Sequence, residues 1–313
     1  MMRIGIDAMG GDYAPLECLR GVLLCKKEFG KEVQLVLIGD KAKITPLLKQ
    51  EGAKEDDFEI IHTTEVIEMG ESPTRSVVSK TDSSIVVGFN LLKEKKIDAF
   101  ASAGNTGAML VGAMLSVKTV PGVIRPTIST IVPRENGKIG ILLDVGANAD
   151  CKPEFLLQFG ILGSLYSKHI FNIENPKVGL LSIGEEEGKG NILTQAAFDL
   201  LKESDKINFI GNVEGRDIFA DTADVIVCDG FTGNIVLKFG ESFYDLIKKR
   251  KIADHYFDSF NYENYGGTPI LGANAPIVIA HGISNALAFR NMITLAKNLI
   301  ETNLVSIFEN AFQ

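Results

Sequence analysis

Short apolar runs alternate with polar turns and helical patterns along most of the chain. The runs typical of strands cover residues 3–7, 33–39, 58–62, 97–101, 127–132, 138–143, 177–183, 208–211, 223–228 and 277–280. Most of them end in a turn rich in glycine, asparagine or aspartate, and a helical pattern follows. Runs that are apolar throughout, such as 33–39, are typical of strands buried on both faces of a parallel sheet. The pattern predicts a three-layer α/β/α sandwich with a mostly parallel sheet.

Three local patterns refine this picture. The residues Glu-Asn-Gly at 135–137 join two strand-like runs as a hairpin would, so we expect one antiparallel pair in a mixed sheet. Residues 72–75 indicate a turn, and Asp40 and Ser83 are expected to cap helices. The length of 313 residues fits a single domain over 1–313, or two lobes with a cleft between them.

The chain is organised around the stretch 97–110, where a short apolar run meets a glycine-rich turn and then a helical pattern. Asn105 or Thr106 would cap that helix, and its first N–H groups would point outward as an anion site. The plain structural alternative is a capped helix after a buried strand. The same design recurs at several other strand ends, and this recurrence favours a ligand site.

Composition narrows the class of protein. The net charge of −8, from 40 acidic and 32 basic residues, argues against a general nucleic-acid binder. The four cysteines, Cys18, Cys25, Cys151 and Cys228, have no CxxC spacing and are expected to be buried or half-buried thiols in a reducing compartment. We expect a cytoplasmic protein, because no apolar run is long enough to span a membrane.

The common cofactor and hydrolase signatures are absent from the sequence, and we expect neither cofactor nor metal. Five aspartates could in principle form a metal site, but they are spread over different turns and indicate loop-orienting acceptors: Asp7, Asp12, Asp144, Asp150 and Asp229. A Ser–His–Asp triad would need His281 near Ser102 or Ser284. The alternative for His281 is a buried histidine bonded to a neighbouring loop.

The turns contain mainly N–H groups, amides, hydroxyls and a few cations. The amides are Asn105, Asn148, Asn191, Asn212, Asn234 and Asn285, and the cations are Arg75, Arg125, Lys189, Arg216 and Lys238. Such groups suit the binding of an oxyanion, most simply phosphate, and the stabilisation of a second, developing oxyanion.

These residues carry a family resemblance. The strings are DAMGGD (7–12), SAGNTGA (102–108), RPT (125–127), LLDVGAN (142–148), GEEEGKGN (184–191), NFIGNVEGRDI (208–218), DVIVCDGFTGNIVLK (224–238), YGGTPILG (265–272) and AHGISN (280–285). In this order they resemble the bacterial acyl-acyl carrier protein:phosphate acyltransferase family over essentially the whole chain. The resemblance implies transfer of a long acyl chain from acyl carrier protein to inorganic phosphate, for use by the glycerol-3-phosphate acyltransferase of phospholipid synthesis. It also implies a homodimer with a fold like those of isopropylmalate dehydrogenase and phosphotransacetylase.

The resemblance and the composition of the turns together give the expected site. The candidate catalytic residues are Asn105, Lys189, Lys238 and His281. The candidate substrate-binding residues are Asp7, Gly10, Gly11, Asp12, Ser102, Gly104, Thr106, Gly107, Asp144, Asn148, Asn212, Asp229, Thr232, Gly233, Asn234, Ser284 and Asn285. Phosphate itself is assigned to Ser102, Asn105 and Thr106 with Thr232 and Asn234. Because phosphate is already anionic at neutral pH, we expect direct transfer, with no acyl-enzyme intermediate and with the cysteines uninvolved.

The acidic carrier protein requires a basic patch on this acidic chain. The candidates are residues 248–251 and 93–96, for which the alternative is a solvated helix end. Residues 241–265 are shorter and less apolar than in many members of the family, so we expect only weak peripheral contact with the inner face of the membrane. Residues 76–80 are also less basic than usual in the family.

Two other classes of protein remain open. One is a related metal- and NAD-dependent decarboxylating dehydrogenase, although its cluster of metal-binding aspartates with substrate-binding arginines is not evident in the sequence. The other is a non-catalytic module that binds acyl carrier protein. A cofactor-dependent absorbance change would favour the first, and carrier binding without thiol release the second.

Overall fold

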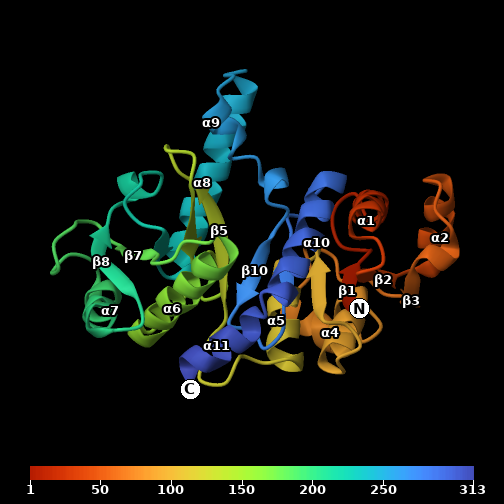
Figure 1. Cartoon of the computed structure of the whole chain (residues 1–313), viewed down its shortest axis with the longest axis horizontal. Helices are drawn as coiled ribbons and strands as arrows, with labels where there is room; N and C mark the ends of the chain where they lie inside the picture. Colours follow the sequence, from red (N-terminus) through yellow and green to blue (C-terminus); the bar gives the residue numbers. More distant parts are fainter. The chain divides into compact units, whose positions relative to one another are not determined.

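The computed structural model describes the backbone of residues 1–313 and every side chain except that of Glu55. The chain forms two compact units (Figure 1). Unit 1 contains Met1–Val120 and Tyr262–Val305, and unit 2 contains Pro121–Asn261 and Ser306–Gln313. No helix in the described part of the chain is both long and apolar enough to cross a membrane.

The sheet of unit 1 is mostly parallel. Its strands, in spatial order, are β3 (Glu59–His62), β2 (Val33–Gly39), β1 (Met2–Asp7), β4 (Ala99–Ser102), β11 (Ile277–Ile279) and β10 (Thr268–Leu271). β1 pairs in parallel with β2 and β4, while β10 runs antiparallel to β11. In the register of β1, Ile6 lies opposite Leu37 on one side and Ala101 on the other. The carboxyl ends of β1 and β4 therefore meet at the same edge of the sheet.

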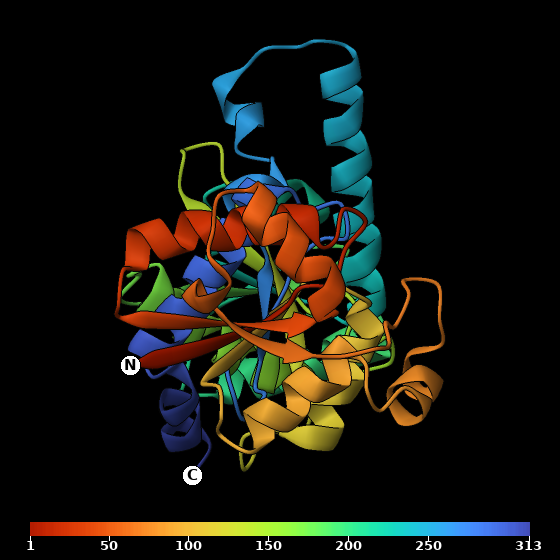
Figure 2. The same cartoon turned by 90° about the vertical axis from the view of Figure 1, so that its right-hand side faces the viewer.

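Helices cover both faces of this sheet. The helices are α1 (Leu16–Phe29), α2 (Lys41–Gln50), α3 (Pro73–Ser79), α4 (Ser84–Lys93), α5 (Thr106–Ser116) and α10 (Ala286–Glu301), with short 3-10 turns at Glu55–Asp57 and Tyr262–Asn264. Figure 2 shows α1 on one face and α4 and α5 on the other. Helices α1 and α10 pack closely against each other, since a β-carbon on Gly21 of α1 would come within 2.5 Å of the Phe289 β-carbon of α10. The rings of Phe89 and Phe100 join α4 to β4 edge to face at 5.1 Å.

Unit 2 contains five strands. The order is β5 (Thr127–Pro133), β6 (Ile139–Leu143), β9 (Val225–Val227), β7 (Lys177–Leu181) and β8 (Asn208–Val213). β5 and β6 are antiparallel, and the other pairs are parallel. The helices of this part are α6 (Pro153–Ile170), α7 (Ile192–Glu203), α8 (Gly230–Lys249) and α9 (His255–Asp258), with a 3-10 turn at Gly215–Asp217. The chain ends in α11 (Leu304–Phe312).

The predicted fold class is confirmed, including the antiparallel pair β5 and β6 in a mostly parallel, mixed arrangement, in which β10 and β11 are a second antiparallel pair. The caps at Asp40 and Ser83 are confirmed as well, since each side chain accepts a backbone N–H of its helix. The turn predicted at 72–75 is wrong, because Pro73 occupies the first position of α3 and Ser72 precedes it.

Two further predictions need correction, and one strand was missed. The strand predicted to end at residue 211 continues to Val213, so Asn212 belongs to β8 and not to the following turn. The single C-terminal helix is two helices, α10 and α11. Strand β10 was not predicted, since its four residues include Pro269, a residue that argues against a strand interior, although the strand pairs antiparallel with β11.

Candidate active site

The carboxyl ends of β1 and β4 are joined by a buried hydrogen-bond chain. The Ser102 hydroxyl donates to the Asp7 carboxylate at 2.6 Å and accepts the Gly104 N–H at 2.9 Å. The other carboxylate oxygen of Asp7 accepts the Met9 N–H at 3.0 Å. Burial raises the pKa of Asp7, and these hydrogen bonds act in the opposite direction. Asp7 and Ser102 therefore hold the glycine-bearing turns in place, with their polar atoms directed at the protein itself.

Gly10 lies so close to the atoms of this hydrogen-bond chain that no side chain would fit there. A β-carbon there would lie 2.6 Å from the Asp7 carboxylate, 2.7 Å from the Gly104 nitrogen and 2.9 Å from the Ser102 hydroxyl. Next to it, the Asp12 N–H donates to the Gly282 carbonyl at 2.7 Å. The loop after β1 is thereby tied to the turn before α5 and to the loop after β11.

Asn105 is the N-cap of α5, as predicted. Its side-chain oxygen accepts the Ala108 N–H at 2.9 Å. Its amide nitrogen donates to the carbonyls of Glu68, Met69 and Glu71 at 3.1, 3.1 and 3.2 Å. Both polar atoms of this buried amide thus have partners within the protein, and its catalytic role stays a prediction. Thr106, the next residue, is exposed at the first turn of α5.

Residues 66–71 form a segment that we call the strap. Lys80 anchors it from behind: its ammonium donates to the Val66 carbonyl at 2.6 Å and forms an ion pair with Glu71. The Ser76 hydroxyl donates to the same carboxylate at 2.6 Å, and these two contacts hold the pKa of Glu71 below its ordinary value. Sequence reasoning missed the strap, because its partners Lys80 and Asn105 lie far along the chain and no local motif marks it.

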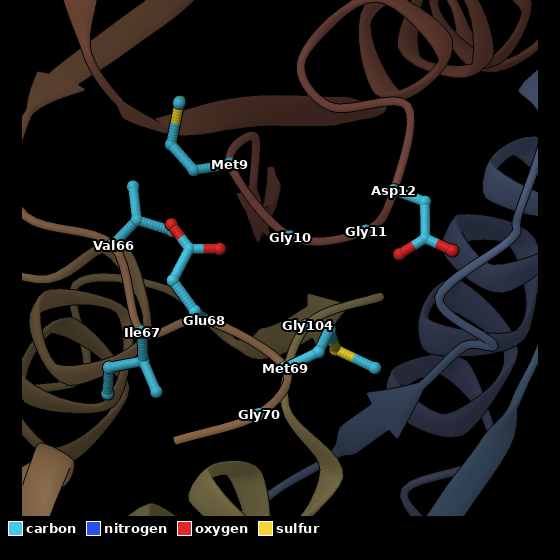
Figure 3. A pocket seen from close by; sticks show the side chains of 10 residues that line it. All are labelled: Met9, Gly10, Gly11, Asp12, Val66, Ile67, Glu68, Met69, Gly70 and Gly104. Carbon is cyan, nitrogen blue, oxygen red and sulfur yellow. The ribbon is translucent and has the colours of Figure 1, made fainter.

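Between the strap and the loop after β1 lies a pocket of about 370 Å³ (Figure 3). Its lining is Met9, Gly10, Gly11, Asp12, Val66, Ile67, Glu68, Met69, Gly70 and Gly104. Figure 3 shows the Glu68 carboxylate pointing from the strap toward Met9 and Gly10, with the Asp12 carboxylate at the other end of the loop. Among the described side chains that line the pocket, none is basic.

The side chains after β11 differ in exposure and in hydrogen-bond partners from what the sequence indicates. His281 is exposed, so the alternative of a buried histidine is wrong. Its Nδ1 lies 3.5 Å from the Ile283 N–H, whereas the Ser284 hydroxyl donates to the His281 carbonyl. Asn285 caps α10, and the Glu17 carboxylate accepts the Ala286 N–H at 2.8 Å. The protein's own carboxylate thus fills the end of this helix.

Unit 2 has a similar buried carboxylate at the end of β6. Asp144 accepts the N–H groups of Ile128, Ala147 and Asn148 at 3.1, 3.1 and 2.6 Å. The Asn148 amide donates to Asp144 and to the Pro126 carbonyl. Burial raises the pKa of Asp144 against these hydrogen bonds. Asp144 and Asn148 therefore shape the loop 144–148, and their role as substrate ligands stays a prediction.

The first turn of α8 packs directly on that loop. Asp229 caps the helix by accepting both the N–H and the hydroxyl of Thr232, at 2.8 and 2.7 Å. A β-carbon on Gly233 would overlap the Asp144 carbonyl oxygen. The Asn234 amide donates to the Val145 carbonyl at 3.2 Å. The structure thus brings together all six residues predicted from these two turns: Asp144, Asn148, Asp229, Thr232, Gly233 and Asn234.

The loop 184–191 carries Lys189, which is exposed. The Asn212 amide nitrogen ties this loop to β8 by donating to the Glu186 carbonyl at 2.8 Å. Within the described residues, neither the Asn212 side-chain oxygen nor the buried Ser182 hydroxyl has a hydrogen-bond partner. A β-carbon on Gly190 would come within 3.0 Å of that hydroxyl, so a polar acceptor borders the loop.

Most of the other predicted cations form ion pairs with nearby carboxylates or are exposed to solvent. Arg216 pairs with Glu214 and Glu185, at 2.9 and 3.3 Å. Lys238 lies farther along α8 and pairs with Glu241 at 2.8 Å. Arg75, Arg125 and both basic clusters are exposed, and within one cluster Lys96 pairs with Glu94.

The environments of the four cysteines disfavour the thiolate form. Cys18, Cys25 and Cys228 are buried and Cys151 is half-buried, which confirms the expected burial. Desolvation raises the pKa of Cys151 to about 11 and that of Cys25 to about 12. It also raises the pKa of the Cys18 and Cys228 thiols well above their usual range.

The strand order and the glycine-bearing turns at the carboxyl ends of the strands define an α/β protein with the fold of phosphotransacetylases. A phosphotransacetylase from Streptococcus pyogenes superposes with a TM-score of 0.62 over 96% of this chain and 94% of its own, at 19% identity. The model of a family described as "Fatty acid synthesis protein" matches residues 2–254. The phosphate acyltransferase of Halothermothrix orenii is 44% identical over 98% of both chains. That of Dictyoglomus turgidum is 43% identical over 96% of this chain and 94% of its own. The chain belongs to the phosphate acyltransferase family.

Proposed function

We propose that this protein transfers a long fatty acyl group from acyl carrier protein to inorganic phosphate and releases acyl phosphate. The observation that carries the proposal is its similarity to phosphate acyltransferases over nearly its full length. The backbone N–H groups and amides of the helix-capping turns support the same chemistry, because such groups suit oxyanions.

The reaction needs little acid or base chemistry. A phosphate oxygen attacks the thioester carbonyl carbon, and the new C–O bond places a negative charge on the carbonyl oxygen. When this intermediate collapses, the C–S bond breaks and the thiolate leaves with the electron pair. The raised pKa values of all four cysteines disfavour an acyl-enzyme on sulfur, which supports direct transfer.

The roles in the site divide by exposure. Thr106, at the first turn of α5, is exposed, and so is Lys189 in unit 2. We assign phosphate binding and charge stabilisation to such groups, together with Thr232 and Asn234. Asp7, Ser102, Asn105 and Asp144 are positioning residues in this proposal, because they are buried and their polar atoms are bonded within the protein. Lys238 and His281 remain candidates for neutralising charge that develops during the reaction.

The exposed surface offers a binding site for the proposed acyl donor. Residues 248–251 at the end of α8 are all exposed and basic, and would receive the acidic carrier protein. The glycerol-3-phosphate acyltransferase would consume the acyl phosphate. We also propose a cytoplasmic location with weak membrane contact. Contact would be weak because the Phe260 ring packs against Phe219 and Tyr256 at 5.2 and 5.3 Å instead of standing free.

The test is the release of free carrier thiol from palmitoyl-acyl carrier protein, with and without inorganic phosphate. We expect release that depends on phosphate, with a hydroxylamine-reactive acyl product. Release without phosphate would indicate a thioesterase. Carrier binding without any release would indicate a non-catalytic module, and either result would overturn the proposal.

A further inference from the structure

We infer that the pocket of unit 1 binds the uncharged, amide-bearing arm through which the donor carries its acyl group, and that it keeps phosphate out. This inference rests on the proposed function and assigns one substrate to one place. The alternative occupants are phosphate itself and the hydrocarbon chain.

The charges of the lining exclude phosphate. Asp12 and Glu68 both present carboxylates to the pocket, and no basic side chain lines it among the residues described (Figure 3). The Lys80 ammonium, which anchors the strap, is directed at the Val66 carbonyl and Glu71 and does not line the pocket. A phosphate dianion inside would therefore face like charges without a counter-ion.

The remaining lining suits a narrow polar arm. Gly10, Gly11, Gly70 and Gly104 contribute no side chains to the lining, so peptide backbone borders the pocket there. Peptide carbonyls and carboxylates accept the N–H groups of amides, and peptide N–H groups donate to amide carbonyls. Met9 and Met69 add flexible thioether side chains that adapt to methylene groups. A hydrocarbon chain would leave these polar groups desolvated without partners.

The position of the pocket would bring the end of the arm, where the thioester is, to the start of α5. Gly104 belongs to the lining and also to the turn that leads into α5. An arm that ends at Gly104 places its thioester beside the exposed Thr106 and the first N–H groups of that helix. Phosphate, kept outside by the carboxylates, would approach the thioester from the same helix end.

The walls of the pocket are fixed by residues that do not touch the ligand. Asn105 and Lys80 hold the strap, and Asp7 with Ser102 holds the opposite loop. Asn105 is thus a positioning residue for the donor site. Its three donor contacts to strap carbonyls account for a buried amide at this position.

The variants that test the inference place a large side chain on the strap so that it fills the pocket. A β-carbon at Gly70 meets no other atom within 4 Å, so Gly70→Phe is compatible with the fold, and Val66→Phe provides a second filling. Gly215→Phe is the matched control, since Gly215 is equally open and lies outside the pocket. We expect at least one filling variant to raise the KM for the acyl donor by about tenfold or more. The KM for phosphate should stay unchanged, and the control should resemble the parent protein.

Pantetheine without an acyl group or carrier is the second probe. We expect it to compete with the acyl donor in the parent protein and to lose potency in the filled variants, whereas a free fatty acid keeps its potency. An unchanged donor KM in both filled variants, or a selective rise in the KM for phosphate, would overturn the inference. A fatty acid that loses potency while pantetheine does not would assign the pocket to the chain instead. If the parent protein shows no phosphate-dependent release, it is the proposed function that fails.

Discussion

Asp7 and Asp144 perform the same task in the two units. Each follows a buried strand, is itself almost fully buried, and accepts backbone N–H groups of the loop that follows. Desolvation raises the pKa of both carboxyls. The cost of burying a charge is offset by the hydrogen bonds, which fix loops that would otherwise be free to rearrange.

Asp7→Asn tests this arrangement through pH. The raised pKa means that the folded protein binds the Asp7 proton more tightly than the unfolded chain, whose value is near 3.8. The stability of the parent protein relative to Asp7→Asn should therefore fall as pH rises from that value through the raised folded one, and then level off. Urea unfolding of both proteins over a pH series measures the difference. A difference that grows with pH would contradict the assignment.

Gly233→Ala tests the contact between α8 and the loop 144–148. The new β-carbon would overlap the Asp144 carbonyl, which is backbone and cannot rotate away. We expect a loss of about 3 kcal/mol or more in the free energy of unfolding. Gly240→Ala is the control in the same helix, where no atom lies within 4 Å. It should gain about 0.5–1 kcal/mol from helix propensity.

The strap shows how a segment without regular structure is held in one conformation. Its carbonyls take hydrogen bonds from Asn105 and Lys80, which belong to other elements of unit 1. Such a segment gains its order from partners and not from its own propensity.

Lys80→Met should loosen the strap without changing the length of the side chain much. Loss of a charged donor to the Val66 carbonyl and of the pairing with Glu71 should speed amide exchange in residues 66–71 roughly tenfold. Hydrogen exchange with mass spectrometry measures this, with Lys93→Met as the exposed control. Unchanged protection of the strap would show that Asn105 alone suffices.

The features that the sequence could predict depend on residues that are close together in the chain. Strands such as β2 are apolar throughout, and the caps Asp40, Ser83 and Asn105 act on N–H groups two or three residues away. β10 depends on its partner β11, and the bonds from Asn105 to the strap span more than thirty residues. Local patterns therefore located the helix caps and most strand ends, whereas the end of β8 at Val213 and the pocket wall depend on the fold.

On the surface of the whole molecule, α8 carries an apolar stripe. Phe231, Ile235, Phe239, Phe243 and Leu246 recur at helical spacing, and each is more than half exposed, with Phe239 at 71%. A stripe of this size on a long helix favours burial against a second copy of the chain. The stripe is therefore the candidate interface of the homodimer that the family resemblance implies.

Phe239→Glu should break this interface by placing a charge on the stripe. We expect a shift from dimer to monomer in sedimentation or light scattering at micromolar concentration, with an unchanged circular dichroism spectrum. Lys248→Ala changes the net charge by the same amount on the opposite face of α8 and should stay dimeric. A monomeric parent protein, or a dimeric Phe239→Glu variant, would contradict the proposal.

The buried thiols make the molecule convenient for site-specific labelling. With its pKa at about 11, the half-buried Cys151 has roughly one thiolate in ten thousand molecules at neutral pH. A cysteine introduced at the open position Gly215 would have an ordinary thiol and roughly a few per cent thiolate. A maleimide dye should therefore attach to Gly215→Cys with one dye per chain while the parent protein stays nearly unlabelled. Fluorescent studies of carrier docking can thus begin without removing any native cysteine.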